Sequence, residues 1–327
     1  MARTSFRIAL YLVILSLPLL PGSPRAQSYP VKPIRIITPF PTGLGPEVAL
    51  RIVTDRLGRT WNQPFIVDAR PGANGFIAIN EAKNVVADGY ALLQAGQAQL
   101  VLNPLIFKKA GYDSQQDFIP ISTIFSAPFF IAVASKGPYG TIRELVAAAR
   151  ANPGKLSYSS PYVGSPGHLG TELFLRQISS QMLHVPFKEA AQVYASVANG
   201  NVDWSMGSIG STLPLVRGGR IKLIAVAAKS RHADFPDIPT VEEAGGPAGY
   251  QVDVWGGVVA PRGTPRDIVG RLSAGFAETL AHPEVQAQFR KIGLEPVSST
   301  SEAMAERIRV ELGTYGDLVA RIGLSVE

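Results

Sequence analysis

The amino-acid sequence predicts an α/β protein built from two lobes, each with a mostly parallel sheet flanked by helices. Three observations lead to this prediction. Short apolar segments of strand length alternate with amphipathic segments of helix length over most of the chain. The alternation stops near residue 130 and then starts again. The length of 327 residues suits about two domains of roughly 150 residues each.

The first set of elements has the order strand, helix, strand, helix, strand. The apolar segments 34–40, 65–68 and 90–94 are the expected strands, and segments 47–57 and 76–86 are the expected helices. This order predicts a largely parallel sheet with helices on its faces.

The second set repeats the alternation. Its expected helices are 141–151, 168–179 and 190–199, and its expected strands are 156–159, 183–187, 202–206 and 221–228. Thr141 and Glu144 have the spacing of a capping box at the start of the first of these helices.

The remainder of the chain is helix-rich. One strand is expected at 252–260, followed by helices at 265–280, 283–292 and 301–322 that pack back on the first lobe. The chain should therefore cross between lobes near 128–131 and 248–254. The predicted division is lobe 1 over 29–129 plus 252–327 and lobe 2 over 130–251.

Residues 1–28 have the features of a secretory signal peptide. Arg3 and Arg7 precede an apolar stretch over 8–20, and cleavage is expected near Ser28. The chain has no cysteine, which excludes disulfides, thiol nucleophiles and cysteine-ligated metals. The formal net charge is +6, but Arg3, Arg7 and Arg25 leave with residues 1–28, so +3 remains. The basic residues are scattered, which argues against a nucleic-acid partner.

Two Gly-rich turns carry the expected chemistry. Turn one, residues 38–47, and turn two, residues 159–168, each join a strand to a helix. Gly43 and Gly45 allow unusual backbone angles, and the free amides of a helix N-terminus attract anions. Ser160 and Ser165 add hydroxyl donors. Two such turns facing one cleft would hold a carboxylate without Arg or Lys.

Two further segments lie at the same predicted sheet edge. A third turn, residues 69–75, offers more amides, and Gln97 is a polar candidate after the third strand. Arg70 could pair with a ligand, but a surface or structural ion pair is the expected role.

Enzyme alternatives find less support. Turn one lacks the third glycine of a dinucleotide fingerprint, and Asp68 is a poor ribose-binding acid because Arg70-Pro71-Gly72 follows it closely. His184 is expected to be structural and His168 to orient its turn or cap its helix. A Ser165–His168 nucleophile pair lacks an orienting acid. No catalytic residue, metal or cofactor is expected.

Several motifs together resemble one known family. The segments YPVKPIRII (29–37), PFPTGLG (39–45), ARPGANG (69–75), NPGKLSY (152–158) and DIPTVEEAG (237–245) are similar to the Bug-type (Bordetella uptake gene) substrate-binding proteins of the tripartite tricarboxylate transporter family. The resemblance runs from Tyr29 to the C-terminus in order and with few gaps.

The resemblance implies a periplasmic, two-lobed Venus-flytrap protein that closes on a carboxylate without catalysis. Its expected partners are that ligand and the membrane subunits of a tripartite tricarboxylate-type transporter, and the chain is expected to be a monomer. The turns and the resemblance together select as ligand-binding residues Thr42, Gly43, Leu44, Gly45, Glu47, Ala73, Gln97, Tyr162, Val163, Gly164, Ser165, His168, Gly207 and Ser208.

This sequence departs from the family pattern at Leu44, Pro46, Glu47 and Gly207. Because relatives often carry an acid near position 207 that meets a ligand ammonium, the hypothesis is a ligand without an amino group and with an apolar or aromatic body. Alternatively, Glu47 points inward and replaces that acid. The expected function is capture of a di- or tricarboxylate or an aromatic acid; a periplasmic sensor adaptor and a Ser/His ester hydrolase are the alternatives.

Overall fold

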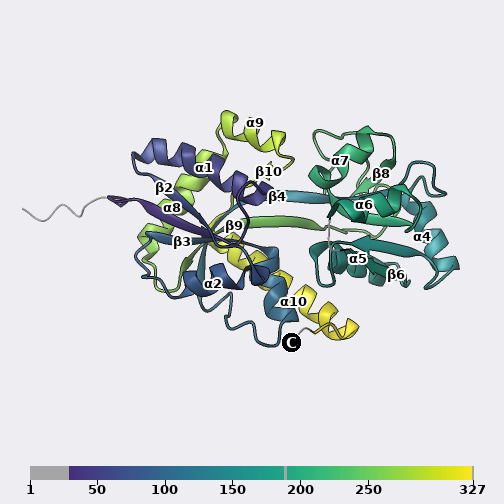
Figure 1. The fold of residues 1–327 in the computed structure, drawn as a ribbon, viewed down its shortest axis with the longest axis horizontal. Coiled ribbons are helices and arrows are strands. Elements are labelled where there is room, and N and C mark those ends of the chain that lie inside the picture. Colours follow the sequence, from purple (N-terminus) through teal and green to yellow (C-terminus); the bar gives the residue numbers. More distant parts are fainter. Residues whose placement is uncertain (1–28, 188–189, 326–327) are drawn as a thin grey trace, which may run out of the picture.

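The computed structural model describes residues 29–187 and 190–325, and it shows two lobes joined by two long strands (Figure 1). These strands are β4 (Phe118–Ala134) and β9 (Asp253–Pro261). β4 pairs with β9 as far as Pro128 and with β7 (Trp204–Ser208) from Phe129 onward. A single strand therefore passes from one lobe into the other at this step. The expected signal peptide, residues 1–28, lies outside the described residues.

The sheet of lobe 1 contains a parallel unit of three strands. These are β1 (Ile34–Thr38), β2 (Phe65–Ala69) and β3 (Ala91–Gly96), with β1 in the middle. β3 then pairs with β9, and β9 with β4, both antiparallel. A short strand, β10 (Glu295–Pro296), adds to β4.

Lobe 2 repeats this plan. Its parallel unit is β5 (Ser157–Ser160) between β6 (Leu183–Pro186) and β7. β4 pairs antiparallel with both β7 and β8 (Ile221–Val226). The two-lobed α/β prediction is confirmed, but the sheets are mixed rather than mostly parallel. The cause is the pair of connecting strands, which run against their neighbours.

Helices cover both faces of each sheet (Figure 1). Those of lobe 1 are α1 (Gly45–Trp61), α2 (Phe76–Lys83), α3 (Asn103–Ile106), α8 (Arg266–Leu280), α9 (Pro283–Lys291) and α10 (Ser301–Ile322). Those of lobe 2 are α4 (Ile142–Ala151), α5 (Pro166–Gln177), α6 (Ala190–Ala198) and α7 (Ile209–Arg217). Helix α7 was not predicted, since Pro214 lies inside it. Thr141 and Glu144 form the predicted capping box.

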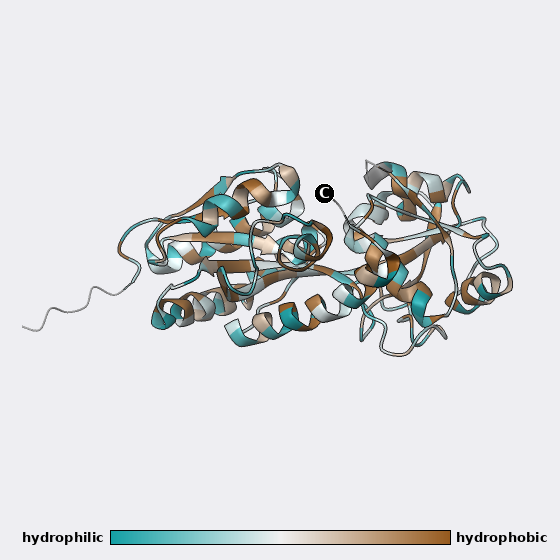
Figure 2. Cartoon of the chain, turned by 90° about the horizontal axis from the view of Figure 1, so that it is seen from below, coloured by the Kyte–Doolittle hydropathy of each residue, from teal (hydrophilic) through white to brown (hydrophobic). Residues whose placement is uncertain are grey.

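The core of lobe 1 lies in two layers, one on each face of its sheet. Leu50 of α1, Phe276 of α8 and Phe289 of α9 pack on one face. Ile79 of α2 and Met304 of α10 pack together on the other face. Hydrophobic residues follow the strands and the inner sides of the helices in both lobes (Figure 2). In the part of the chain that the structure describes, no helix has the length and apolar character needed to span a membrane.

Candidate functional site

Glu47 holds turn one in place. Its side chain is only 1% exposed. Oε2 accepts a hydrogen bond from the Gly43 amide at 3.0 Å, and Oε1 pairs with Arg51 Nε at 2.5 Å. Gly43 has a φ of 84°, which a glycine adopts without strain. Because both carboxylate oxygens are engaged, Glu47 shapes the turn and presents no free acid to the cleft.

The outer part of turn one faces solvent. Thr42, Gly43 and Leu44 are exposed, and the Leu44 side chain is an exposed apolar group. At the start of α1, the amides of Gly45 and Glu47 donate to no acceptor within the described residues. Unpaired first-turn amides at the positive end of a 17-residue helix are donors for an anion.

Turn two is stabilised by its own side chains. Ser165 is the N-cap of α5, where its Oγ accepts a hydrogen bond from the His168 amide at 3.2 Å. The Gly164 amide donates to His168 Nδ1 at 3.0 Å. Ser165 Oγ also donates to Ser160 Oγ, which lies 2.7 Å from His184 Nε2. His168 therefore orients the turn, as expected. The Ser165 hydroxyl contacts the His168 backbone and not its imidazole.

Two imidazoles stack directly behind turn two. The ring centroids of His168 and His184 lie 4.1 Å apart, and the Tyr158 ring stacks on His184 at 4.9 Å. Burial lowers the pKa of His168 to about 4, with a further contribution from His184. Burial also lowers the pKa of His184 to about 4. Both rings are therefore neutral at pH 7 and act as packing and hydrogen-bonding groups, which confirms the structural role expected for His184.

This pair makes stability depend on pH. In the unfolded chain a histidine titrates near pH 6.5, whereas the folded rings titrate near 4, so the unfolded state binds protons first as the pH falls. We expect the free energy of unfolding to be constant above about pH 7 and to fall between pH 6.5 and 4, by at most about 3 kcal/mol for His168.

Urea denaturation between pH 4.5 and 7.5 measures this effect. Carboxyl groups also titrate near pH 4.5. The informative quantity is therefore the difference in free energy of unfolding between the wild type and His168→Gln at each pH. His282→Asn, which changes a partly exposed histidine, is the matched control. If the free energies of unfolding of the wild type and His168→Gln differed by the same amount at every pH, the prediction would be contradicted.

Three of the turns selected from the sequence surround one cavity of about 250 Å³ between the lobes. Turn one contributes Pro39 and Pro41, the third turn contributes 71–72 and 74–75, and turn two contributes 162–164. Helix α3 forms a further wall with Ile106. The exposed side chains of Tyr162 and Val163 lie at its rim. The predicted residues Tyr162, Val163 and Gly164 therefore lie on a shared inter-lobe cavity.

Gln99 lies on this cavity, together with Asn74 and Asn103, whereas the predicted Gln97 does not. Gln97 is buried, and its Nε2 donates to Glu311 of α10 at 3.0 Å. Gln99 lines the cavity instead. The shift arises because β3 is followed by a π-helical turn, Ala98–Leu102, which rotates the side chains relative to an α-helical start. The polar residues that follow the strand indicated this segment in the sequence. Which of them lines the cavity depends on the π-helical turn.

The third turn has a left-handed backbone. The φ angles of Gly72, Ala73, Asn74 and Gly75 are all positive. Ala73, another predicted residue, is exposed at this point, and the residues on either side of it line the cavity. Such strained backbone is often found at ligand sites.

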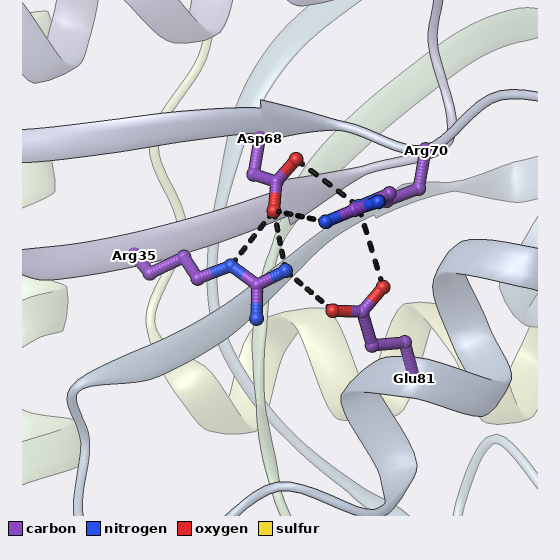
Figure 3. A network of polar contacts seen from close by, with 4 residues as sticks. All are labelled: Arg35, Asp68, Arg70 and Glu81. Atoms are coloured by element: carbon purple, nitrogen blue, oxygen red, sulfur yellow. Dashed lines mark hydrogen bonds and ion pairs between the residues drawn. The ribbon is translucent and has the colours of Figure 1, made fainter.

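Arg70 belongs to a four-residue ion-pair network beside this turn (Figure 3). Its Nε lies 3.1 Å from Asp68 Oδ1 and 3.5 Å from Glu81 Oε2. Arg35 bonds to the same two acids. Burial alone would raise the pKa of Asp68, but the hydrogen bonds and charges of Arg35 and Arg70 outweigh it and hold that pKa below its usual range. The structural role expected for Arg70 is confirmed, and Asp68 is occupied.

Gly207 lies at the end of β7, where Tyr194 of α6 fills the space in front of it. A Cβ atom at position 207 would lie 1.6 Å from the Tyr194 hydroxyl oxygen. The adjacent Ser208 is half-buried, and its Oγ lies 3.1 Å from Ser211 Oγ. The glycine is therefore required by a neighbouring side chain, and a phenol stands where a side chain at 207 would project.

Comparison with known proteins gives a consistent picture. The family model described as tripartite tricarboxylate transporter family receptor matches residues 49–324. A UPF0065 protein of Bordetella bronchiseptica is 31% identical over 309 residues, which are 94% of this chain and 90% of that protein. A solved structure of an R. palustris protein with adipate is 30% identical, with a TM-score of 0.75 and coverage of 91% of this chain and 99% of that one. The periplasmic binding protein BugD is 25% identical, with a TM-score of 0.71 and coverage of 91% and 100%.

Proposed function

Because this chain belongs to the tripartite tricarboxylate transporter receptor family, we propose that it captures a small organic carboxylate between its lobes and delivers it to a transporter of that type. The observation that supports this most is the inter-lobe cavity bounded by turns from both lobes. The R. palustris relative with adipate supports a carboxylate as the ligand class.

The two helix N-termini supply the chemistry of capture. The amides of Gly45 and Glu47 in α1 have no protein acceptor, and the same holds for the Gly167 amide in α5, within the residues that the structure describes. The Glu47 carboxylate and the His168 imidazole hold the two turns in shape. In a cleft that loses water, hydrogen bonds from fixed amides to a carboxylate become stronger.

Lobe closure is the proposed mechanism of capture. Lobe 1 comprises residues 29–129 plus 252–327, and lobe 2 comprises 130–251. β4 changes partners between Pro128 and Phe129, and β9 starts at Asp253, so rotation at these two strand crossings would open and close the cavity that the turns surround. The mature protein acts in the periplasm after cleavage near Ser28, as a monomer that presents its closed form to the membrane subunits.

Binding without catalysis is also part of the proposal. The Ser–His contact at this site joins Ser160 to His184, and Ser160 is fully buried. A substrate carbonyl could not reach that hydroxyl without unfolding the turn. Relatives of this family are receptors.

Ligand screening of the mature protein tests the proposed function. A carboxylate that binds tightly should raise the melting temperature of the protein, since a ligand present at 100 times its Kd adds about 2.7 kcal/mol to the free energy of unfolding. Ser165→Ala should cost about 1 kcal/mol of stability and weaken that binding, because Ser165 caps α5 and organises turn two.

Thr300→Ala is the matched control, since Thr300 caps α10 through an equivalent hydrogen bond to the Ala303 amide. It should cost similar stability and leave affinity unchanged. Absence of stabilisation by any carboxylate, or turnover of carboxylate esters, would overturn the proposed function.

A further inference from the structure

The inter-lobe cavity is uncharged. Its lining is made of proline, glycine, aliphatic, aromatic and amide residues, and within the described chain no Asp, Glu, Lys, Arg or His contributes to it. Its volume of about 250 Å³ exceeds the roughly 150 Å³ that holds a benzene molecule in a protein interior. The space therefore suits an aromatic ring with one substituent.

Gln99 presents a hydrogen-bond donor to this cavity from a side chain that its surroundings hold in place. Gln99 is 7% exposed, and its Oε1 accepts a hydrogen bond from the Gly96 amide at 3.1 Å. Because the Gly96 donor fixes the oxygen on that side, the Nε2 group must face the other way. Nε2 has no hydrogen-bond partner among the described residues, although the side chain is more than nine-tenths buried. Nε2 is not one of the fully enclosed unpaired side-chain atoms of the described residues, so it is open to the cavity and can donate to a bound molecule there.

The position of Gln99 is fixed by its surroundings. The Tyr112 hydroxyl donates to the backbone carbonyl oxygen of Gln99 and so holds the main chain at this residue. A Cβ atom at Gly75 would lie 3.0 Å from Gln99 Cγ and 3.2 Å from Pro39 Cβ, so the carboxamide lies between turn one and the third turn. The donor is therefore preorganised at the place where the turns meet.

We propose, resting on the carboxylate-binding function above, that this cavity holds the body of the ligand and that Gln99 Nε2 donates to a neutral oxygen on it. The ligand class is an aromatic monocarboxylate with a hydroxyl or carbonyl substituent. A second carboxylate in the cavity would be buried beside neutral donors and no cation, which is unfavourable. An ammonium group would find no carboxylate there.

Calorimetry with matched probes tests this assignment. The probes are benzoate, 3- and 4-hydroxybenzoate, benzene-1,4-dicarboxylate, adipate and aspartate. We expect one hydroxybenzoate to bind about 3- to 10-fold tighter than benzoate, the range of one neutral hydrogen bond, and the dicarboxylates and aspartate to bind more weakly than benzoate. In Gln99→Met the preference for hydroxybenzoate should disappear.

Gln97→Met is the control, because Gln97 lies two residues away, is equally buried and donates to Glu311. It should change stability while keeping the preference for hydroxybenzoate. If Gln99→Met weakened benzoate and hydroxybenzoate equally, Gln99 would contact the carboxylate itself and the proposal would fail. Preferred binding of adipate or of the aromatic dicarboxylate would overturn the ligand class but leave the proposed function standing. Binding of no carboxylate would overturn both.

Discussion

Replacing Gly207 by alanine is expected to lower the free energy of unfolding by about 3 kcal/mol or more. The added Cβ would lie 1.6 Å from the Tyr194 hydroxyl and 2.6 Å from its ring. Tyr194 on α6 is buried in the core of lobe 2, so its ring cannot move aside without disturbing the side chains packed around it. Urea denaturation of the wild type and Gly207→Ala measures the loss.

A double-mutant cycle with Tyr194→Ala shows whether this contact is the cause. Tyr194→Ala alone should cost about 3–5 kcal/mol, since it removes a buried aromatic ring. Once the ring is absent, Gly207→Ala should cost little more, so the two losses should be strongly non-additive. Additive losses would mean that Tyr194 does not set the requirement for glycine.

The contact with Tyr194 changes how the glycine at position 207 is interpreted. From the sequence, Gly207 suggested a missing acid and hence a ligand without an ammonium group. The structure adds that position 207 has no room for any side chain while Tyr194 is present. Tyr194 is 13 positions earlier in the chain, and no periodic pattern connects the two residues. Contacts of this kind depend on how α6 packs on β7, which local sequence does not determine.

Elements with strong local signals were predicted well. The helix expected over 301–322 has those bounds in the structure, and Thr141 caps α4 as its spacing predicted. In each case the signal is a cap or an apolar periodicity within a single element. Strand β4 was not predicted: its 17 residues cross from one sheet to the other at the point where only a crossing between lobes was expected.

The candidate site was predicted at the level of turns more than at the level of side chains. The three turns that the Gly-rich segments indicated surround one cavity in the structure. The hydroxyls of Ser160 and Ser165, which were predicted as donors to a carboxylate, bond to each other and to groups within turn two or next to it. Gln99 lines the cavity and Gln97 does not, because the segment forms a π-helical turn that composition does not reveal. Hydrogen-bond partners inside a turn depend on its backbone angles, and these follow from the whole lobe.

Gly164→Ala is expected to reduce ligand affinity at least 10-fold while costing about 1–2 kcal/mol of stability. Gly164 of turn two has a φ of 83°, which accounts for the stability loss in an alanine variant. Its Cβ position lies 2.9 Å from Ile106 Cδ1 in helix α3 of lobe 1. The new methyl group would therefore hold the lobes apart at the edge of the cavity, and closure would be penalised more than folding.

Two further variants separate the lobe contact from backbone strain. Gly154→Ala introduces an alanine at a φ of 75° with no atom within 4 Å of its Cβ, so it should lose similar stability and keep full affinity. Ile106→Val removes the Cδ1 atom that the new methyl group meets, and its remaining Cγ2 lies 3.9 Å away, so it should restore part of the affinity lost in Gly164→Ala. Calorimetry gives the affinities, and small-angle scattering with saturating ligand reports whether the lobes close. If Gly164→Ala bound as tightly as Gly154→Ala, the liganded lobes would not approach as closely at Gly164 and Ile106 as they do here, and the contact would have no part in closure.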